Sequence, residues 1–213
     1  MQLNAEDGGH RKFIMVQIPE KCDEKSEAYK AGYKNICEIG KERIRRAGQK
    51  IRNEQLGIRN DADNSSLLTP NSSLDIGFRV LKCDTSNMKK VYYTPSEFGS
   101  ESLDDLISNI KEDRTPEDLL FQVMLDLGIL LSSKIQVRSE KVGMRSYSYF
   151  DVEDGYLIAC FDKNIDEEVI TAIAKQKPYY FVMRDSSMAT DSVGTNFEQI
   201  FATYSPDTVR KVL

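Results

Sequence analysis

The sequence predicts an α/β protein in two parts, and three observations support this fold class. An apolar run at residues 13–18 precedes an amphipathic helical segment, and a second, alternating run follows at residues 75–83. From about residue 98 onward, short apolar runs alternate with helical patterns. Strand, helix and strand in this order form the parallel βαβ unit of nucleotide-binding sheets. We therefore expect a partial Rossmann-like sheet in residues 1–97 and a smaller α/β domain in residues 98–213.

The first part is expected to begin with a short helix and a strand. Residues 1–6 have the composition of a helix end, and Gly8 and Gly9 stop the helix because glycine tolerates left-handed backbone. The strand at residues 13–18 ends before Pro19, since proline cannot donate a hydrogen bond to a strand ladder.

A long amphipathic helix should follow near residues 34–51. Its apolar residues recur at three- and four-residue spacing, which predicts that one stripe packs on a sheet. That stripe consists of Tyr33, Ile36, Cys37, Gly40, Ile44, Ala47 and Ile51. Residues 53–73 are rich in Asn, Asp and Ser and predict an excursion between elements. The strand at residues 75–83 then ends at the turn-forming Asp84.

The second part should contain helices and short strands around its own core. Thr115, Pro116 and the acidic residues after them predict a helix start, because proline fits the first turn and carboxylates face the positive end of the helix dipole. Residues 153–155 predict a hairpin turn. Helices are expected at residues 103–110, 118–131, 165–175 and 195–202, and strands at residues 134–137, 146–152, 156–161, 179–183 and 208–213.

The composition argues against several classes of protein. No apolar run approaches the roughly 20 residues of a membrane span, and no signal-peptide pattern opens the chain, so we expect a cytoplasmic protein without a membrane partner. The four cysteines are widely spaced, which predicts buried or half-buried free thiols and no metal site. The single histidine, His10, lies in a polar stretch beside glycines and is poorly placed as a catalytic base. We predict no catalytic residue.

Basic residues concentrate on the predicted long helix, although the net charge of the chain is −5. Two interpretations fit this cluster. It forms either a solvated helix face or the phosphate-facing edge of a larger DNA-binding protein. Its members are Lys34, Lys41, Arg43, Arg45, Arg46, Lys50, Arg52 and Arg59.

Three residues are candidates for binding a nucleotide-containing cofactor. Glu20 follows the first strand of the unit, where a carboxylate can accept both hydroxyls of a ribose, and Gln17 can hydrogen-bond in a similar place. Asp84 ends the next strand at the same sheet edge, on the adenine side. Each has a simpler interpretation, as a solvated turn residue for Glu20 and as a turn cap for Asp84. No glycine-rich phosphate loop is present.

Several phrases of the chain closely resemble the modification (methyltransferase) subunit of type III restriction-modification systems. They are KFIMVQIPE (12–20), CDEKS (22–26), GYKNICEIGKERIRR (32–46), DIGFRVLK (75–82), DTSN (84–87), TPEDLL (115–120) and FVMRDSSM (181–188). The resemblance spans nearly the whole chain and implies an adenine-specific DNA methyltransferase that uses S-adenosylmethionine. It places Glu20 or Gln17 at the ribose and Asp84 at the adenine of that cofactor.

The same resemblance implies which parts lie elsewhere. The Asp-Pro-Pro-Tyr catalytic motif and the Phe-x-Gly-x-Gly-like cofactor turn of the family do not occur in this sequence. We therefore expect a C-terminal piece of a modification subunit, a natural truncation or a deliberate fragment, that is inactive alone. The implied partners are DNA, the restriction subunit and a second modification subunit, with a homodimer as a further expectation. The alternative is a non-catalytic assembly module formed from about residue 98 onward.

Overall fold

Two units make up the chain, Met1–Val80 and Leu81–Leu213, hereafter unit 1 and unit 2. The computed structural model describes residues 1–55, 75–89, 109–143 and 145–213. The domain boundary predicted between residues 97 and 98 lies outside these described residues, as do most of the predicted excursion and the helix predicted at residues 103–110.

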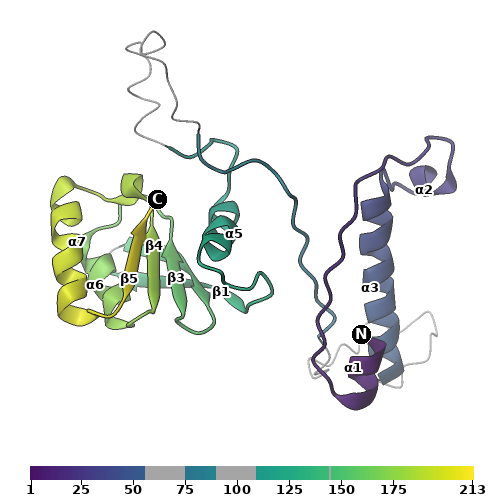
Figure 1. Cartoon of the computed structure of the whole chain (residues 1–213), viewed down its shortest axis with the longest axis horizontal. Helices are drawn as coiled ribbons and strands as arrows, with labels where there is room; N and C mark the ends of the chain where they lie inside the picture. Colours follow the sequence, from purple (N-terminus) through teal and green to yellow (C-terminus); the bar gives the residue numbers. More distant parts are fainter. Residues whose placement is uncertain (56–74, 90–108, 144) are drawn as a thin grey trace, which may run out of the picture. The chain divides into compact units, whose positions relative to one another are not determined.

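Unit 1 is built around one long helix (Figure 1). Its helices are α1 (Gln2–Asp7), α2 (Glu27–Lys30) and α3 (Ile36–Gln55). The predicted glycine stop of α1 is confirmed, because Gly8 has left-handed backbone with φ of 68°. Two extended segments, residues 12–20 and 75–80, accompany α3.

The strands predicted at residues 13–18 and 75–83 are wrong as strands, since the structure assigns no strand pairing to either segment. A strand exists only through hydrogen bonds to a neighbour. No hydrogen bond is found for the backbone N–H and C=O groups of residues 13–16 within the described parts of the chain. The sequence therefore predicted extended backbone correctly and its pairing wrongly.

The packed face of α3 also differs from the predicted stripe. Ile36 and Ala47 are exposed, whereas Cys37 and Gly48 meet the extended segments. The Cys37 Sγ donates to the backbone carbonyl of Gln17 at 3.6 Å, and a Cβ built on Gly48 would lie 3.0 Å from the Cβ of Ile76. The contact face thus shares Cys37 with the predicted stripe and is turned toward Gly48, away from Ile36 and Ala47.

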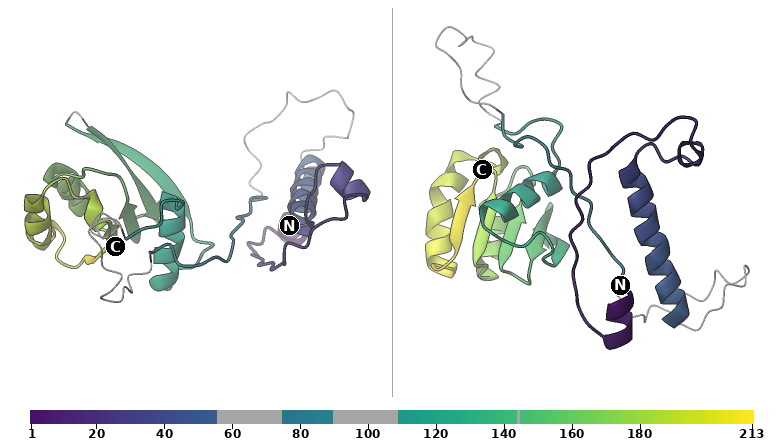
Figure 2. Two further views of the ribbon diagram at one scale, coloured as in Figure 1. Left: turned by 90° about the horizontal axis from the view of Figure 1, so that it is seen from above. Right: turned by 45° about the vertical axis from the view of Figure 1, so that its right-hand side comes forward.

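Unit 2 is a three-layer α/β domain (Figure 2). Its sheet has the order β1-β2-β3-β4-β5, with β1, β2 and β3 antiparallel and β3, β4 and β5 parallel. The strands are β1 (Ile135–Val142), β2 (Arg145–Val152), β3 (Leu157–Cys160), β4 (Tyr180–Met183) and β5 (Val209–Val212). The helices are α5 (Pro116–Asp126), α6 (Glu167–Lys175) and α7 (Asp191–Tyr204), with the 3-10 turn η2 (Asp185–Ser187) after β4.

Each face of this sheet has its own hydrophobic core. On one face, α5 packs Leu119, Leu120, Val123 and Met124 against Val152, Leu157 and Val182. On the other face, α6 and α7 cover Tyr149, Ile158 and Phe181 with Ile170, Ile173 and Phe201. Both cores are buried within unit 2, so this unit has the organisation of an independently folded domain.

Local signals in unit 2 are confirmed in detail. Thr115 and Asp118 form a reciprocal capping box at the start of α5, with Pro116 in its first turn. The N-cap of α6 is Asp166, whose carboxylate accepts the Val169 N–H. β1 extends to Val142, beyond the predicted residue 137, because it pairs along its full length with β2.

Candidate functional site

Gln17 and Glu20 lie together at the end of the first extended segment of unit 1. The Glu20 backbone carbonyl accepts the Ile36 N–H at 3.0 Å, which places the chain at Glu20 beside the first turn of α3. The Glu20 carboxylate is exposed and has no partner among the described residues. The Gln17 side chain donates only to the neighbouring carbonyl of Ile18, at 3.1 Å. Both side chains are therefore accessible to a ligand.

Asp84 belongs to unit 2 and is already engaged there. Its Oδ1 accepts the Thr85 N–H at 2.7 Å, and its Oδ2 lies 3.2 Å from the Arg114 guanidinium. The amide of Thr85, and next the charge of Arg114, lower the pKa of the Asp84 carboxyl. Asp84 is thus an ionised turn-capping residue. The structure places it in a different unit from Gln17 and Glu20.

The turn after Asp84 is fixed to the start of α5. Lys111 Nζ donates to Thr85 Oγ1 at 2.8 Å, and the Asn87 amide donates to the Asp118 carbonyl at 2.8 Å. The Asn87 N–H in turn donates to Gln122 Oε1 at 3.1 Å. These contacts join residues more than 20 positions apart, so no local sequence pattern could have indicated them.

A polar network on the β1–β2 hairpin was also missed by the sequence analysis. Glu140 accepts hydrogen bonds from the hydroxyls of Tyr147 at 3.1 Å and Tyr149 at 2.6 Å. Burial first, and then the Glu140 carboxylate, raises the pKa of Tyr149 to about 12 and raises the pKa of Tyr147 as well. Both hydroxyls therefore stay protonated at neutral pH. Glu140 and Tyr147 lie directly opposite each other on the paired strands, and this cross-strand pairing is the signal that could have indicated the network.

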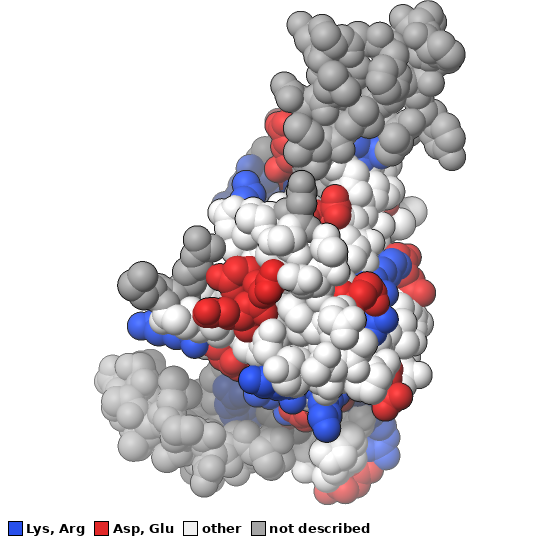
Figure 3. Space-filling view, turned by 90° about the vertical axis from the view of Figure 1, so that its left-hand side faces the viewer, with Lys and Arg blue, Asp and Glu red and all other residues white. Residues whose placement is uncertain are grey.

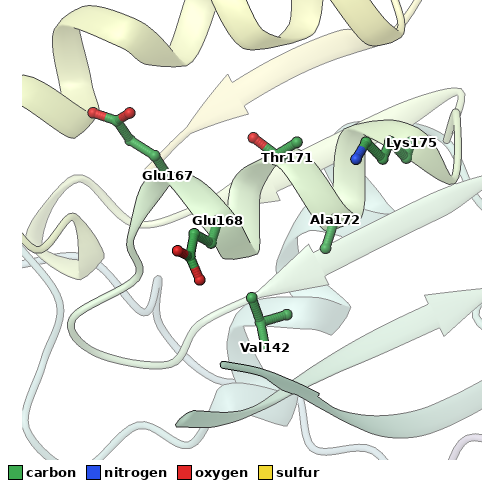
Figure 4. Close-up of a pocket in the computed structure, with 6 residues that line it drawn as sticks. All are labelled: Val142, Glu167, Glu168, Thr171, Ala172 and Lys175. Atoms are coloured by element: carbon green, nitrogen blue, oxygen red, sulfur yellow. The ribbon is translucent and has the colours of Figure 1, made fainter. Parts of the chain in front are cut away.

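A shallow depression of about 470 Å³ lies on the outer surface of α6 (Figure 4). Glu168 and Ala172 point toward Val142 of β1, whereas Glu167 and Thr171 point the other way. Glu167 accepts a hydrogen bond from the Asn196 amide at 2.8 Å, so its carboxylate is already bound. The depression offers no nucleophile with an adjacent base.

The cysteines differ in exposure. Cys160 is buried, and desolvation raises the pKa of its thiol to about 12, which makes it unreactive. Cys22 and Cys37 are half-buried, as predicted, whereas Cys83 is exposed because the strand predicted around it does not pair.

Two absences characterise the described part of the chain. None of its helices combines the length and apolar character that crossing a membrane requires. Nowhere in it do three His, Cys, Asp or Glu side chains gather as metal ligands would.

Charge separates the two units. Unit 1 contains 14 Lys and Arg against 12 Asp and Glu, a net charge of +2, and unit 2 contains the remaining 15 and 22, a net charge of −7. Figure 3 shows one group of acidic side chains on the face turned to the viewer, with Lys and Arg side chains around it. The basic residues of unit 1 are concentrated on α3, which has six Lys and Arg and three Glu.

Comparison with known proteins gives one informative similarity. No family model matches the sequence. The chain is 37% identical over 108 residues to the Mod subunit of the type III restriction-modification enzyme StyLTI of Salmonella typhimurium strain LT2. The aligned region covers 51% of this chain and 13% of that protein. This similarity supports a relationship between the chain and the Mod subunits of type III restriction-modification systems.

Proposed function

We propose that this chain contributes part of an adenine-specific DNA methyltransferase of a type III restriction-modification system. The similarity to the StyLTI Mod subunit carries this proposal. In it, residues 1–97 supply the βαβ portion of a Rossmann-like cofactor sheet, and residues 98–213 serve assembly. The cytoplasm as its location stays a prediction.

The exposed apolar row of unit 1 supports a place inside a larger sheet. Ile14 and Val16 are 93% exposed and Ile18 is 72% exposed, on the alternate positions of one extended segment. Strands of parallel sheets in α/β proteins are buried on both faces and read as nearly continuous apolar runs. A segment of this composition, in which the backbone groups of residues 13–16 have no partner among the described residues, has the properties of such a strand.

The cofactor of the proposed enzyme is S-adenosylmethionine, which supplies the methyl group when it is bound. Glu20 would accept the ribose hydroxyls, with Gln17 beside it, because the carboxylate is exposed and unpaired within the described chain. Asp84 would lie on the adenine side, held in place by Arg114. The sequence has neither the catalytic Asp-Pro-Pro-Tyr motif nor the glycine turn, so we expect no methyl transfer by this chain alone.

Titration calorimetry with S-adenosylmethionine tests the cofactor site. We expect binding in the micromolar range that Glu20→Ala and Asp84→Asn each weaken. The matched controls are Glu24→Ala and Asp113→Asn, which make the same charge changes nearby and should leave binding unchanged. Equal binding by the site variants and the unchanged chain would refute the assigned residues. Turnover on duplex DNA would refute the expected inactivity.

A second candidate function is that of a non-catalytic assembly module. Unit 2 favours it, because the unit has two complete cores and no reactive cluster in its described residues. Its partners would be the restriction subunit, a second modification subunit or another copy of the chain. Light scattering of the chain alone and with the restriction subunit tests this function. A tight complex without detectable cofactor binding would favour assembly over the cofactor site.

A further inference from the structure

The long helix α3 divides its basic residues between two faces. Lys41 is bound to Glu38 at 2.6 Å, Arg45 lies 5.7 Å from the ring centre of Phe78, and Arg52 is half-buried. These three face the side on which the extended segments lie. The other three, Arg43, Arg46 and Lys50, lie on the opposite side of the helix and are exposed. The side chain of Arg45 is 59% exposed as well, beside Phe78.

The exposed residues form a straight stripe. Arg43, Arg46 and Lys50 are spaced i, i+3 and i+7, which places them on one side of a helix. At 1.5 Å of rise per residue the stripe is about 10 Å long. The side chains of Arg46 and Lys50 are 74% and 75% exposed. The stripe is therefore accessible along its whole length.

The charge of the stripe is only weakly compensated. Arg46 pairs with Glu42 at 2.7 Å and Lys50 with Glu54 at 3.8 Å, while no ion pair is found for Arg43 within the described residues. Exposed ion pairs of this kind contribute about 0–1 kcal/mol each. A ligand with a dense negative charge can therefore displace the glutamates.

We propose that Arg43, Arg46 and Lys50 form a contact surface for the phosphate backbone of double-stranded DNA. This inference rests on the proposed function, in which DNA is the polyanion that the protein meets. Duplex DNA carries one negative charge per about 1.7 Å of its axis when both strands are counted, so the roughly 10 Å of duplex beside the stripe carries about six phosphates. Cations on a straight helix reach phosphates without reading bases, so the contact is independent of sequence.

The test measures fluorescence anisotropy of a labelled duplex of about 20 base pairs, long enough to span the stripe, at several salt concentrations. The variant Arg43→Gln, Arg46→Gln and Lys50→Gln keeps helix propensity, because glutamine is close to arginine and lysine in this respect. We expect it to bind about tenfold more weakly at low salt, and the slope of log K against log salt to fall by about 2 to 3. Circular dichroism checks that the helix content is unchanged.

Two further variants make the test specific. Lys141→Gln, Lys163→Gln and Lys177→Gln together remove the same charge from exposed positions of unit 2 and should leave the slope unchanged. Arg43→Lys with Arg46→Lys keeps the charge and should also keep the slope. The inference is overturned if the unchanged chain does not bind duplex DNA at low salt, or if the stripe variant keeps the original slope.

Cofactor binding separates this inference from the proposed function. The stripe variant should bind S-adenosylmethionine as the unchanged chain does, because none of its three residues is assigned to the cofactor. The inference is supported if the stripe variant has a smaller slope of log K for duplex DNA against log salt and still binds the cofactor. If the unchanged chain does not bind S-adenosylmethionine but binds duplex DNA with the expected dependence on salt, the result counts against the proposed cofactor site and supports the stripe.

Discussion

The ion pair between Arg138 and Asp151 allows a quantitative test of the β1–β2 hairpin. Asp151 is 4% exposed, and its carboxylate lies 2.7 Å from Arg138 and accepts the Gly155 N–H at 2.6 Å. Removing one partner of a fully buried pair costs about 3–5 kcal/mol, and an exposed pair contributes about 0–1 kcal/mol. The Arg138 side chain is 43% exposed. We therefore expect Arg138→Met to lower the free energy of unfolding by about 2 kcal/mol.

Urea unfolding with a double-mutant cycle measures this coupling. Asp151→Asn keeps the size of the side chain and its bond to Gly155, and should cost about 1 kcal/mol. The double variant should cost less than the sum of the two, by about 1–2 kcal/mol, since the second change removes a group that has already lost its partner. Lys163→Met is the control for removing an exposed cation. Additive effects, or a loss of under about 0.5 kcal/mol for Arg138→Met, would refute the reasoning.

Four further predictions concern unit 2. Thr115→Ala removes the α5 cap and should cost about 1 kcal/mol in urea unfolding, and an unchanged midpoint would contradict the cap. Hydrogen bonds from Thr115 lower the pKa of Asp118. Their contribution to the free energy of unfolding is therefore full above the usual pKa of 3.8 and is lost as the pH falls through the lower pKa of the folded state. Asp118→Asn should flatten this dependence of stability on acid pH, and an unchanged profile of stability against pH would refute the argument. Leu120→Ala empties a fully buried site and should cost about 2–5 kcal/mol, whereas a cost below about 1 kcal/mol would mean that the core collapses around it. Cys83 should react with a thiol reagent at pH 7 in the folded chain and Cys160 only after unfolding, and rapid labelling of Cys160 would contradict its burial.

The sequence predicted most of unit 2 because its signals are local. Thr115 and Pro116 marked the start of α5, where the structure has a capping box. The hairpin turn at residues 153–155 adopts positive φ at all three positions, as its glycine and acidic residues predicted. Short apolar runs marked the strands of this unit. These features depend on neighbours within four residues, which a single sequence displays.

The candidate site was predicted less well because its contacts are not local. Asp84 caps a turn through the neighbouring Thr85 N–H, as one of its two interpretations predicted, whereas its ion pair with Arg114, 30 positions later, has no local signal. The carboxylate of Glu20 depends on where the chain returns to the start of α3. The spacing of residue types along the chain does not indicate these long-range contacts. The sequence therefore indicated the types of residue in the site and not their partners.

The missing strands of unit 1 have an energetic explanation. Among its described residues only Gly48 is buried, so the apolar row of Ile14, Val16 and Ile18 gains almost nothing from α3 alone. Burying one such side chain contributes about 1.5–3 kcal/mol, so burying all three would contribute about 4.5–9 kcal/mol. That is comparable to the whole stability of a small domain. The extended backbone is thus encoded locally, whereas its pairing requires a surface that α3 and the second extended segment do not provide. The proposed place in a larger methyltransferase sheet would explain why this segment has the sequence of a strand but no strand paired with it among the described residues.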